Sequence, residues 1–377
     1  MVAVVVVVAV VVVVVVAVAE DNMHTKSFPI HSETRYAPPS LLFQWHITER
    51  CNLRCAHCYQ DNYARDELSF ENLLTVLVQY KTLLATLSER RGKRLHAHIT
   101  VTGGEPFARR DFLDLLEILA AHRKLFSFAI LTNGTFIDAQ MAQRLRQLAP
   151  RFVQVSIEGT EATHDRIRGK GNFAKTVTAI KQLRCERVRT IISFTAHRQN
   201  FREFPAVAQL GQRLNVNRVW ADRLIPWGSG AQLREQVMTP AETQTFFELM
   251  KTARDKRVWF NGTDIAMHRA LQFLVGDGQP YHCTAGDTLL TVQPNGDLYP
   301  CRRMPIKVGN LLETSLLELY DNSPLLRQLR DPEQISEDCQ DCFYAKLCRG
   351  GLKCLSYAVA GDPFKAEPGC WLQKSRP

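Results

Sequence analysis

Six segments of the chain carry short apolar runs or apolar residues in alternation with polar ones, the pattern of β-strands. The expected strands are Leu41–Thr48, His96–Thr102, Ser127–Thr132, Phe152–Ile157, Arg189–Ala196 and Asn217–Ile225. Between them, apolar residues recur at helical spacing. The expected helices are Ser69–Ser88, Asp111–His122, a helix from Asp138 that ends before Pro150, Phe173–Leu183 and Glu203–Leu214. Strands that alternate with helices predict an α/β fold with a parallel sheet.

Periodicity alone leaves a barrel and a doubly wound sheet open, and both place chemistry at the carboxyl ends of the strands. A further helix is expected over Ala241–Arg257, with Pro240 in its first turn. From about Tyr281 the pattern changes to short strands, a turn at Pro294–Asp297 and many cysteines, which indicates a small domain held by metal. The expected organisation is a first domain over 40–235, a helical linker over 236–276 and a second domain over 277–377.

The first residues of the chain are almost pure valine and alanine. Val2–Ala19 is as long as a membrane span but lacks the cationic start of a secretory signal. We interpret residues 1–22 as a tag or sequence artefact rather than as a membrane anchor, with Met23 as an alternative start, and we expect no membrane association.

Composition narrows the function classes. The chain has 377 residues and a net charge of +9, and its Lys and Arg residues are dispersed rather than gathered into a nucleic-acid footprint, so we expect no nucleic-acid partner. Seven of the eleven cysteines lie between Cys283 and Cys370. A chain of this size needs no disulfides for stability, so the cysteines indicate metal or iron–sulfur ligation in a reducing compartment, the cytoplasm.

Three cysteines lie in one loop after the first expected strand. Cys51, Cys55 and Cys58 are separated by three and two residues. A closed zinc site needs four ligands, and this loop adds only His57, directly beside Cys58. Three thiolates suit three corners of a [4Fe–4S] cluster and leave the fourth iron open.

This spacing resembles the signature of radical S-adenosylmethionine (SAM) enzymes, and four later segments resemble that family in order. They are Thr102–Pro106, Thr132–Gly134, Ser156–Gly159 with His164–Gly169, and Leu224–Gly228. One position departs, because Glu158 stands where the family has Asp. The resemblance implies a partial (β/α)6 barrel in which Cys51, Cys55 and Cys58 hold the SAM-binding cluster. The residues that it implies for SAM binding are Tyr59, Gly103, Gly104, Glu105, Asn133, Ser156, Arg168 and Leu224, with Glu105 accepting the SAM ammonium group and Ser156 and Arg168 holding its carboxylate.

The later cysteines resemble the SPASM extension of the same enzymes, which holds two auxiliary [4Fe–4S] clusters. The resemblance groups Cys339, Cys342, Cys348 and Cys370 into one cluster and Cys283, Cys301 and Cys354 into the other. The gap from Cys348 to Cys354 is five residues where the family has three. The three-cysteine cluster is expected to have an open or non-cysteine position, with Asp287 as a candidate oxygen ligand. Two zinc sites are the alternative for this domain.

The implied reaction is the cleavage of SAM to a 5′-deoxyadenosyl radical that abstracts hydrogen from a substrate, with three [4Fe–4S] clusters and SAM as cofactors. We expect a peptide substrate, bound directly or through a separate leader-binding protein, and a flavodoxin- or ferredoxin-type reductant. The alternatives are a tetrapyrrole side-chain decarboxylase or lyase of haem synthesis, and a non-catalytic electron carrier, against which the intact Gly103–Pro106 segment argues. The sequence assigns no catalytic acid or base. His46 and His197 are interpreted as packing residues and Cys185 as a small buried hydrophobe.

Overall fold

A computed structural model describes residues 36–64, 66–256, 262–276 and 278–372. The interpretation of residues 1–22 falls outside these ranges. From Ala37 onward the chain forms one compact unit.

The centre of that unit is a parallel sheet whose strands follow one another in chain order. Its first six strands are β1 (Ser40–His46), β2 (His96–Thr102), β3 (Ser127–Thr132), β4 (Val153–Ser156), β5 (Thr190–Ala196) and β6 (Arg218–Arg223). Each pairs in parallel with the next. A doubly wound sheet reverses its strand order at a switch point, and this sheet does not, so the doubly wound alternative is wrong. The strands form the curved wall of a partial barrel.

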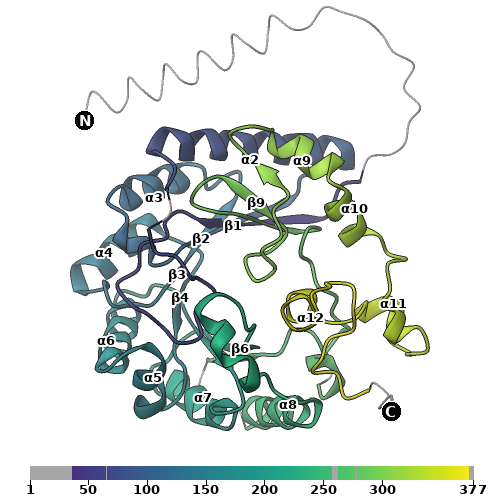
Figure 1. Ribbon diagram of the computed structural model, residues 1–377. Helices are drawn as coiled ribbons and strands as arrows, with labels where there is room; N and C mark the ends of the chain where they lie inside the picture. The colour runs from purple at the N-terminus through teal and green to yellow at the C-terminus, as the bar shows by residue number, and fades with distance from the viewer. Residues whose placement is uncertain (1–35, 65, 257–261, 277, 373–377) are drawn as a thin grey trace, which may run out of the picture. The chain divides into compact units, whose positions relative to one another are not determined.

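The helices that connect the strands lie around the outside of this wall (Figure 1). They are α2 (Phe70–Arg91), α3 (Phe112–Ala121), α4 (Ala139–Leu148), α5 (Glu161–Arg168), α6 (Asn172–Cys185), α7 (Phe204–Arg213) and α8 (Pro240–Asp255). Local sequence fixes several of their ends. Ser69 accepts a hydrogen bond from the amide of Asn72 at the start of α2, and Thr239 forms a capping box with Glu242 at the start of α8.

Four further strands extend the sheet at its two edges. They are β7 (Asp264–Ala266), β8 (Leu289–Val292), β9 (Asp297–Tyr299) and β10 (Gly309–Asn310). Strand β7 pairs with β6, and β8 pairs in parallel with β1, from Leu42 opposite Leu289 to Trp45 opposite Val292. The turn expected at Pro294–Asp297 joins the antiparallel strands β8 and β9. The cysteine-rich segment is therefore joined to the barrel by a continuous sheet of ten strands.

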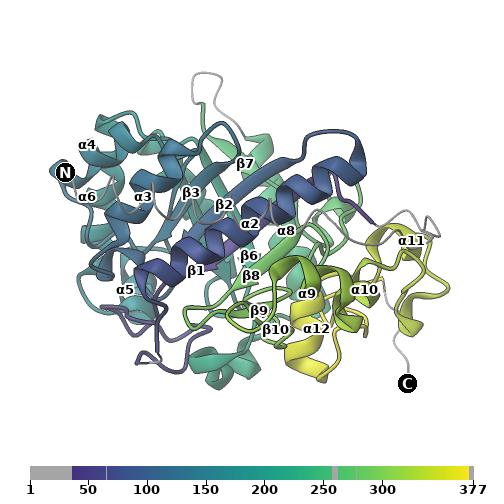
Figure 2. The same cartoon turned by 90° about the horizontal axis from the view of Figure 1, so that it is seen from above.

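The rest of the C-terminal segment is short helices and loops. The helices are α9 (Leu316–Asn322), α10 (Pro324–Arg330), α11 (Ala345–Cys348) and α12 (Lys353–Ala360). Figures 1 and 2 show α9 alongside α2, with α10 next to α9. Arg90, in the last turn of α2, donates two hydrogen bonds to Asp321 at the end of α9.

Strand β1 shows how the sequence divides its two faces. Leu41, Phe43 and Trp45 are fully buried, and the Phe43 ring stacks on Tyr80 of α2. The intervening residues Gln44 and His46 point to the inside of the barrel, where they line a cavity. Alternation along the strand thus places the apolar core between sheet and helices and leaves a polar interior. Among the described helices, none is long and apolar enough to cross a membrane.

Candidate functional site

The loop with the first three cysteines follows β1 and is fastened at several points. The amide of Ala56 donates to the carbonyl of Ile167 at 2.9 Å, and the amide of Gly230 donates to the carbonyl of Cys58 at 2.9 Å. Cys51, Cys55 and Cys58 all line the same cavity and interact electrostatically with one another. Burial raises the pKa of Cys51 to about 11. Three thiols therefore converge on one wall of the barrel interior.

The loop after β2 packs directly on this cysteine loop. The amide of Gly104 donates to Thr48 O at 2.8 Å, and that of Glu105 donates to Arg50 O at 2.8 Å. A Cβ on Gly104 would lie 2.3 Å from Arg50 O, a distance that no side chain tolerates. Gly103 and Gly104 line the cavity. These glycines let two backbones touch, a role that the sequence did not assign to them.

Glu105 lies behind the cavity wall. It is fully buried and accepts hydrogen bonds from Thr132 Oγ1 at 2.8 Å and from the amide of Asn133 at 2.7 Å. Burial raises its pKa to about 7, against the opposing effect of these hydrogen bonds. The carboxylate is thus engaged with the end of β3.

The other residues expected to bind SAM divide into two groups. Tyr59, Asn133, Ser156 and Arg168 line the cavity, and Asn133 Nδ2 lies 2.9 Å from Asn52 Oδ1 and 4.0 Å from Cys51 Sγ. Leu224 is buried at the end of β6 and is not among the residues that line the cavity. The structure therefore brings four of these expected residues to the cavity that the three cysteines line, and Leu224 is not one of its lining residues.

A buried ionic cluster holds Arg168 beside the thiols. Glu158 is fully buried, and its Oε1 accepts from Arg168 Nε at 3.0 Å and Nη2 at 2.5 Å and lies 3.0 Å from His57 Nε2. Burial alone would raise the pKa of Glu158, but Arg168 and His57 outweigh it and hold that pKa well below its usual range. Arg168 Nη1 lies 3.7 Å from Cys55 Sγ. Glu158, which departs from the family pattern, thus positions Arg168.

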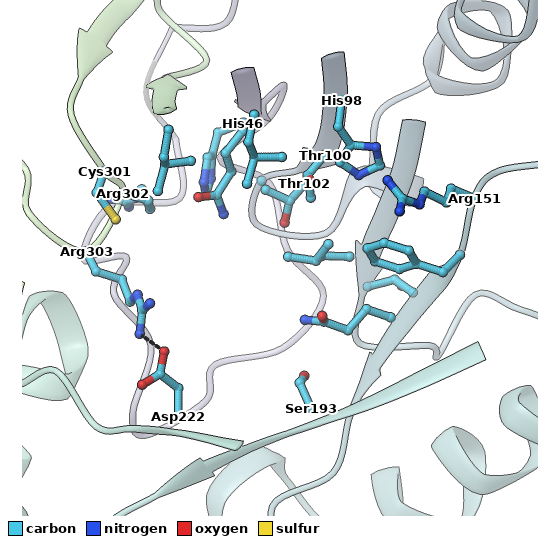
Figure 3. A pocket seen from close by; sticks show the side chains of 18 of the residues that line it. His46, His98, Thr100, Thr102, Arg151, Ser193, Asp222, Cys301, Arg302 and Arg303 are labelled. Carbon is cyan, nitrogen blue, oxygen red and sulfur yellow. Dashed lines mark hydrogen bonds and ion pairs between the residues drawn. The ribbon is translucent and has the colours of Figure 1, made fainter. Parts of the chain in front are cut away.

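The cavity fills the barrel interior and has a volume of about 1120 Å³. Small or polar side chains of the strands line it, as Figure 3 shows for several of them. They include Gln44, His46, Thr100, Thr102, Gln154, Ser156, Ser193, Thr195 and Asp222. A closed eight-stranded barrel fills this space with bulky apolar side chains. The small polar residues here leave room for SAM together with part of a substrate.

Four of the later cysteines surround a second, smaller cavity. Cys339, Cys342, Cys348 and Cys370 all line it. Burial raises the pKa of Cys339 and of Cys348 to about 11, and both thiols interact electrostatically with Cys370. The structure thus brings together the four residues that the family pattern groups.

The remaining three cysteines lie at the boundary with the barrel. Cys301 and Cys354 interact electrostatically with each other and with Cys283, and Cys301 also lines the large cavity. The acidic residue that acts on Cys354 is Asp222, which accepts a hydrogen bond from Arg303 at 2.6 Å. Asp287, the expected oxygen ligand, has its Oδ2 3.9 Å from His282 Nε2. Asp222 and Arg303 were both missed in the sequence, where neither belongs to a motif.

The donor sets suit clusters better than single metal ions. All eleven cysteines carry free thiols. Zinc needs four ligand atoms about 2.0–2.3 Å from one point, and within the described ranges no three His, Cys, Asp or Glu side chains are placed to hold one metal ion. His57, the only other zinc ligand offered by the first loop, faces Glu158. Thiols grouped around a cavity fit a cluster of four irons, which spaces its ligands further apart than a single ion does.

Comparisons with known proteins identify two regions. A model of the Radical SAM superfamily matches residues 45–211, and a model of the iron–sulfur cluster-binding SPASM domain matches residues 283–343. AdoMet-dependent heme synthase of Methanosarcina barkeri is 26% identical over 352 residues, which cover 87% of this chain and 95% of the relative. Mycofactocin maturase MftC of Mycobacterium ulcerans is 29% identical over 342 residues, 86% of each chain.

Solved structures show the same architecture. SuiB of Streptococcus suis bound to S-adenosylmethionine is similar with a TM-score of 0.68 and 17% identity over 88% of this chain and 77% of SuiB. The protein anSMEcpe with bound AdoMet is similar with a TM-score of 0.68 and 20% identity over 88% of this chain and 91% of the other. At these identities the likeness shows the fold alone.

Proposed function

Since this chain belongs to the radical SAM superfamily and carries a SPASM domain, we propose that it is an oxidoreductase that abstracts hydrogen from a peptide held in the barrel cavity. One observation carries the proposal. The three thiols of the first loop and Cys301 of the second domain line the same cavity. A substrate that enters this cavity lies between the two cysteine groups.

Each group of residues has a part in this reaction. Cys51, Cys55 and Cys58 would hold the SAM-binding cluster, and the later cysteines would hold two auxiliary clusters. When bound, the first cluster would supply the electron for cleavage of SAM to methionine and a hydrogen-abstracting 5′-deoxyadenosyl group, and the auxiliary clusters would supply a site that can accept an electron. Arg168, fixed by Glu158, would orient the SAM carboxylate with Ser156.

Several relatives support a peptide as substrate. One relative is named as the mycofactocin maturase, and a structurally similar protein, SuiB, is bound to its precursor peptide SuiA. A flavodoxin- or ferredoxin-type protein would supply the electron, and a separate leader-binding protein would deliver the peptide. Free thiolate ligands need a reducing compartment, so we place the protein in the cytoplasm.

A tetrapyrrole is the second candidate substrate, and the match to AdoMet-dependent heme synthase favours it. The cavity is lined by arginines, which suit the carboxylates of a tetrapyrrole as well as those of an acidic peptide. AdoMet-dependent heme synthase matches over nearly its full length. Both substrates require the same SAM chemistry.

The test is SAM cleavage by protein reconstituted anaerobically with iron and sulfide. With dithionite as reductant, we expect 5′-deoxyadenosine to form, detected by chromatography and mass spectrometry. A deuterated substrate would then transfer deuterium into 5′-deoxyadenosine. Testing a deuterated precursor peptide encoded beside this gene against a deuterated coproporphyrin shows which of the two is the substrate. Protein that carries its full iron complement and yet leaves SAM intact would refute the proposed function.

Exchange of Glu158 for glutamine (E158Q) is expected to lower the rate of SAM cleavage by about 10- to 100-fold, the usual cost of losing a group that orients a ligand of a metal site. The neutral amide removes the charge that holds Arg168 beside Cys55. The matched control is E161Q, an exposed position on α5. Equal rates for wild type and E158Q, measured as 5′-deoxyadenosine per minute, would show that Arg168 needs no such support.

A further inference from the structure

Among the described residues, neither the guanidinium group of Arg302 nor the Nε2 of His46, both buried in the cavity wall, has a hydrogen-bond partner. We propose that Arg302 and His46 form a binding site for a carboxylate of the substrate, between the first cysteine loop and the auxiliary cysteines. The inference rests on the proposed function for its substrate, a peptide, and deepens it by naming the group that the peptide presents. Figure 3 shows both side chains at the same wall of the cavity.

Arg302 follows Cys301 directly and is buried, with 6% of its surface exposed. It lines the cavity, and across the described ranges no hydrogen bond or ion pair engages its guanidinium group. Two other arginines of the cavity wall do have acidic partners: Arg303 donates to Asp222, and Arg168 donates to Glu158. A buried charge without a counterion is costly, so an anion from outside the chain would relieve Arg302.

His46 is the last residue of β1 and is also buried, with 7% exposed. Within the part of the chain that the structure describes, its Nε2 has no hydrogen-bond partner. Burial and the charge of Arg302 lower the pKa of His46 well below its usual range. A neutral imidazole donates one hydrogen bond, so the pair offers a guanidinium fork and a ring N–H to one ligand.

The charge of the cavity wall points to an anionic ligand. Seven arginines line it: Arg94, Arg123, Arg151, Arg168, Arg269, Arg302 and Arg303. Among the described lining residues Asp222 is the only acid, and Arg303 at 2.6 Å and Arg269 at 3.7 Å already engage it. A carboxylate matches the planar fork of arginine in two parallel hydrogen bonds. A peptide supplies that group as an Asp or Glu side chain.

The thiolates of the auxiliary cysteines and those of the first cysteine loop would also attract the charge of Arg302. Each of these two groups already lies beside another arginine. The cation that acts on Cys301 and Cys354 is Arg303. The cation beside the first cysteine loop is Arg168, 3.7 Å from Cys55 Sγ. Arg302 is therefore left for a ligand in the cavity between them.

The experiment measures the binding of defined carboxylate probes to the reconstituted protein, saturated with SAM and without reductant. The probes are an acetylated, amidated peptide of alternating glutamate and glycine, the same peptide with glutamine for glutamate, and coproporphyrin III. Calorimetry should show that wild type binds the glutamate peptide at least about 10-fold more tightly than the glutamine peptide, since charged hydrogen bonds are the strong ones. In Arg302→Gln (R302Q) this preference should vanish, in R302K part of it should remain, and the exposed surface variant R110Q should match wild type.

The outcomes separate this inference from the proposed function. Tighter binding of coproporphyrin III with the same loss in R302Q would support the carboxylate site and assign it to a tetrapyrrole instead of a peptide. Equal affinity for the two peptides in wild type, or no binding of any carboxylate probe, would overturn it. So would an R302Q protein that keeps the preference but loses auxiliary iron or SAM affinity, because Arg302 would then serve a cofactor. SAM cleavage is assayed independently, so its failure would refute the enzyme function without touching the probe result.

Discussion

Replacement of Cys55 by alanine is expected to reduce 5′-deoxyadenosine formation to background, a loss of more than about 100-fold, since even a group behind a metal ligand costs 10- to 100-fold. The Cys55 thiol interacts electrostatically with the thiols of Cys51 and Cys58, and its Sγ lies 3.7 Å from Arg168 Nη1. Without its thiolate, one iron of the proposed cluster would lose its protein ligand. The measurement is iron and sulfide per chain together with the product yield after dithionite reduction.

Cys185 supplies the matched control for this experiment. It is the last residue of α6, it is exposed, and it belongs to none of the three cysteine groups. C185A should keep wild-type iron content and turnover. If C55A also kept its turnover, the first loop would not hold the cluster that cleaves SAM, and the site would have to be sought among the later cysteines.

The strand pattern could be predicted because it depends on near neighbours in the sequence. Alternation with a period of two placed all six barrel strands within a few residues of their observed bounds, as with Leu41–Thr48 for β1 at Ser40–His46. The short helix α5 was not predicted, since Glu161–Arg168 has little apolar face and is fixed by contacts such as that of Ile167 with Ala56. The pairing of β8 with β1 was missed as well, because only the folded chain brings together strands more than 240 residues apart.

The functional site likewise combines features that the local sequence predicts with features that only the folded chain determines. The spacing of Cys51, Cys55 and Cys58 is local, and resemblance supplied the grouping of the later cysteines, which stays a prediction. The interpretation of Cys185 as buried was wrong, because apolar neighbours in the sequence do not settle which side of a helix end meets solvent. His46 was interpreted as a packing residue because alternation does not say which face of a strand is enclosed by helices. With Phe43 and Trp45 in the core, His46 must face the cavity.

A buried ion pair ties the end of β6 to the loop before the last cysteine. Glu367 is 1% exposed, and its Oε1 accepts from Arg223 while Oε2 accepts from the amide of Leu352 at 2.7 Å. Burial lowers the pKa of Arg223 to about 10, a sign of how strongly this site disfavours charge. The amide of Cys370 donates to the carbonyl of Glu367 at 3.1 Å, so the pair also supports the four-cysteine group.

E367A is expected to lower the free energy of unfolding by about 3–5 kcal/mol, because it strands the buried charge of Arg223. Urea unfolding followed by circular dichroism measures this loss, and iron analysis should show less auxiliary iron per chain.

E367Q keeps an acceptor for the amide of Leu352 and should lower the free energy of unfolding by less, about 1–3 kcal/mol. The control is D264N, which breaks the half-exposed pair of Arg218 and Asp264, 2.7 Å apart, and should cost less than about 1 kcal/mol. A loss in E367A no larger than that in D264N would mean that water or another group replaces the carboxylate, and that the barrel and the cysteine-rich segment are joined chiefly through β1 and β8.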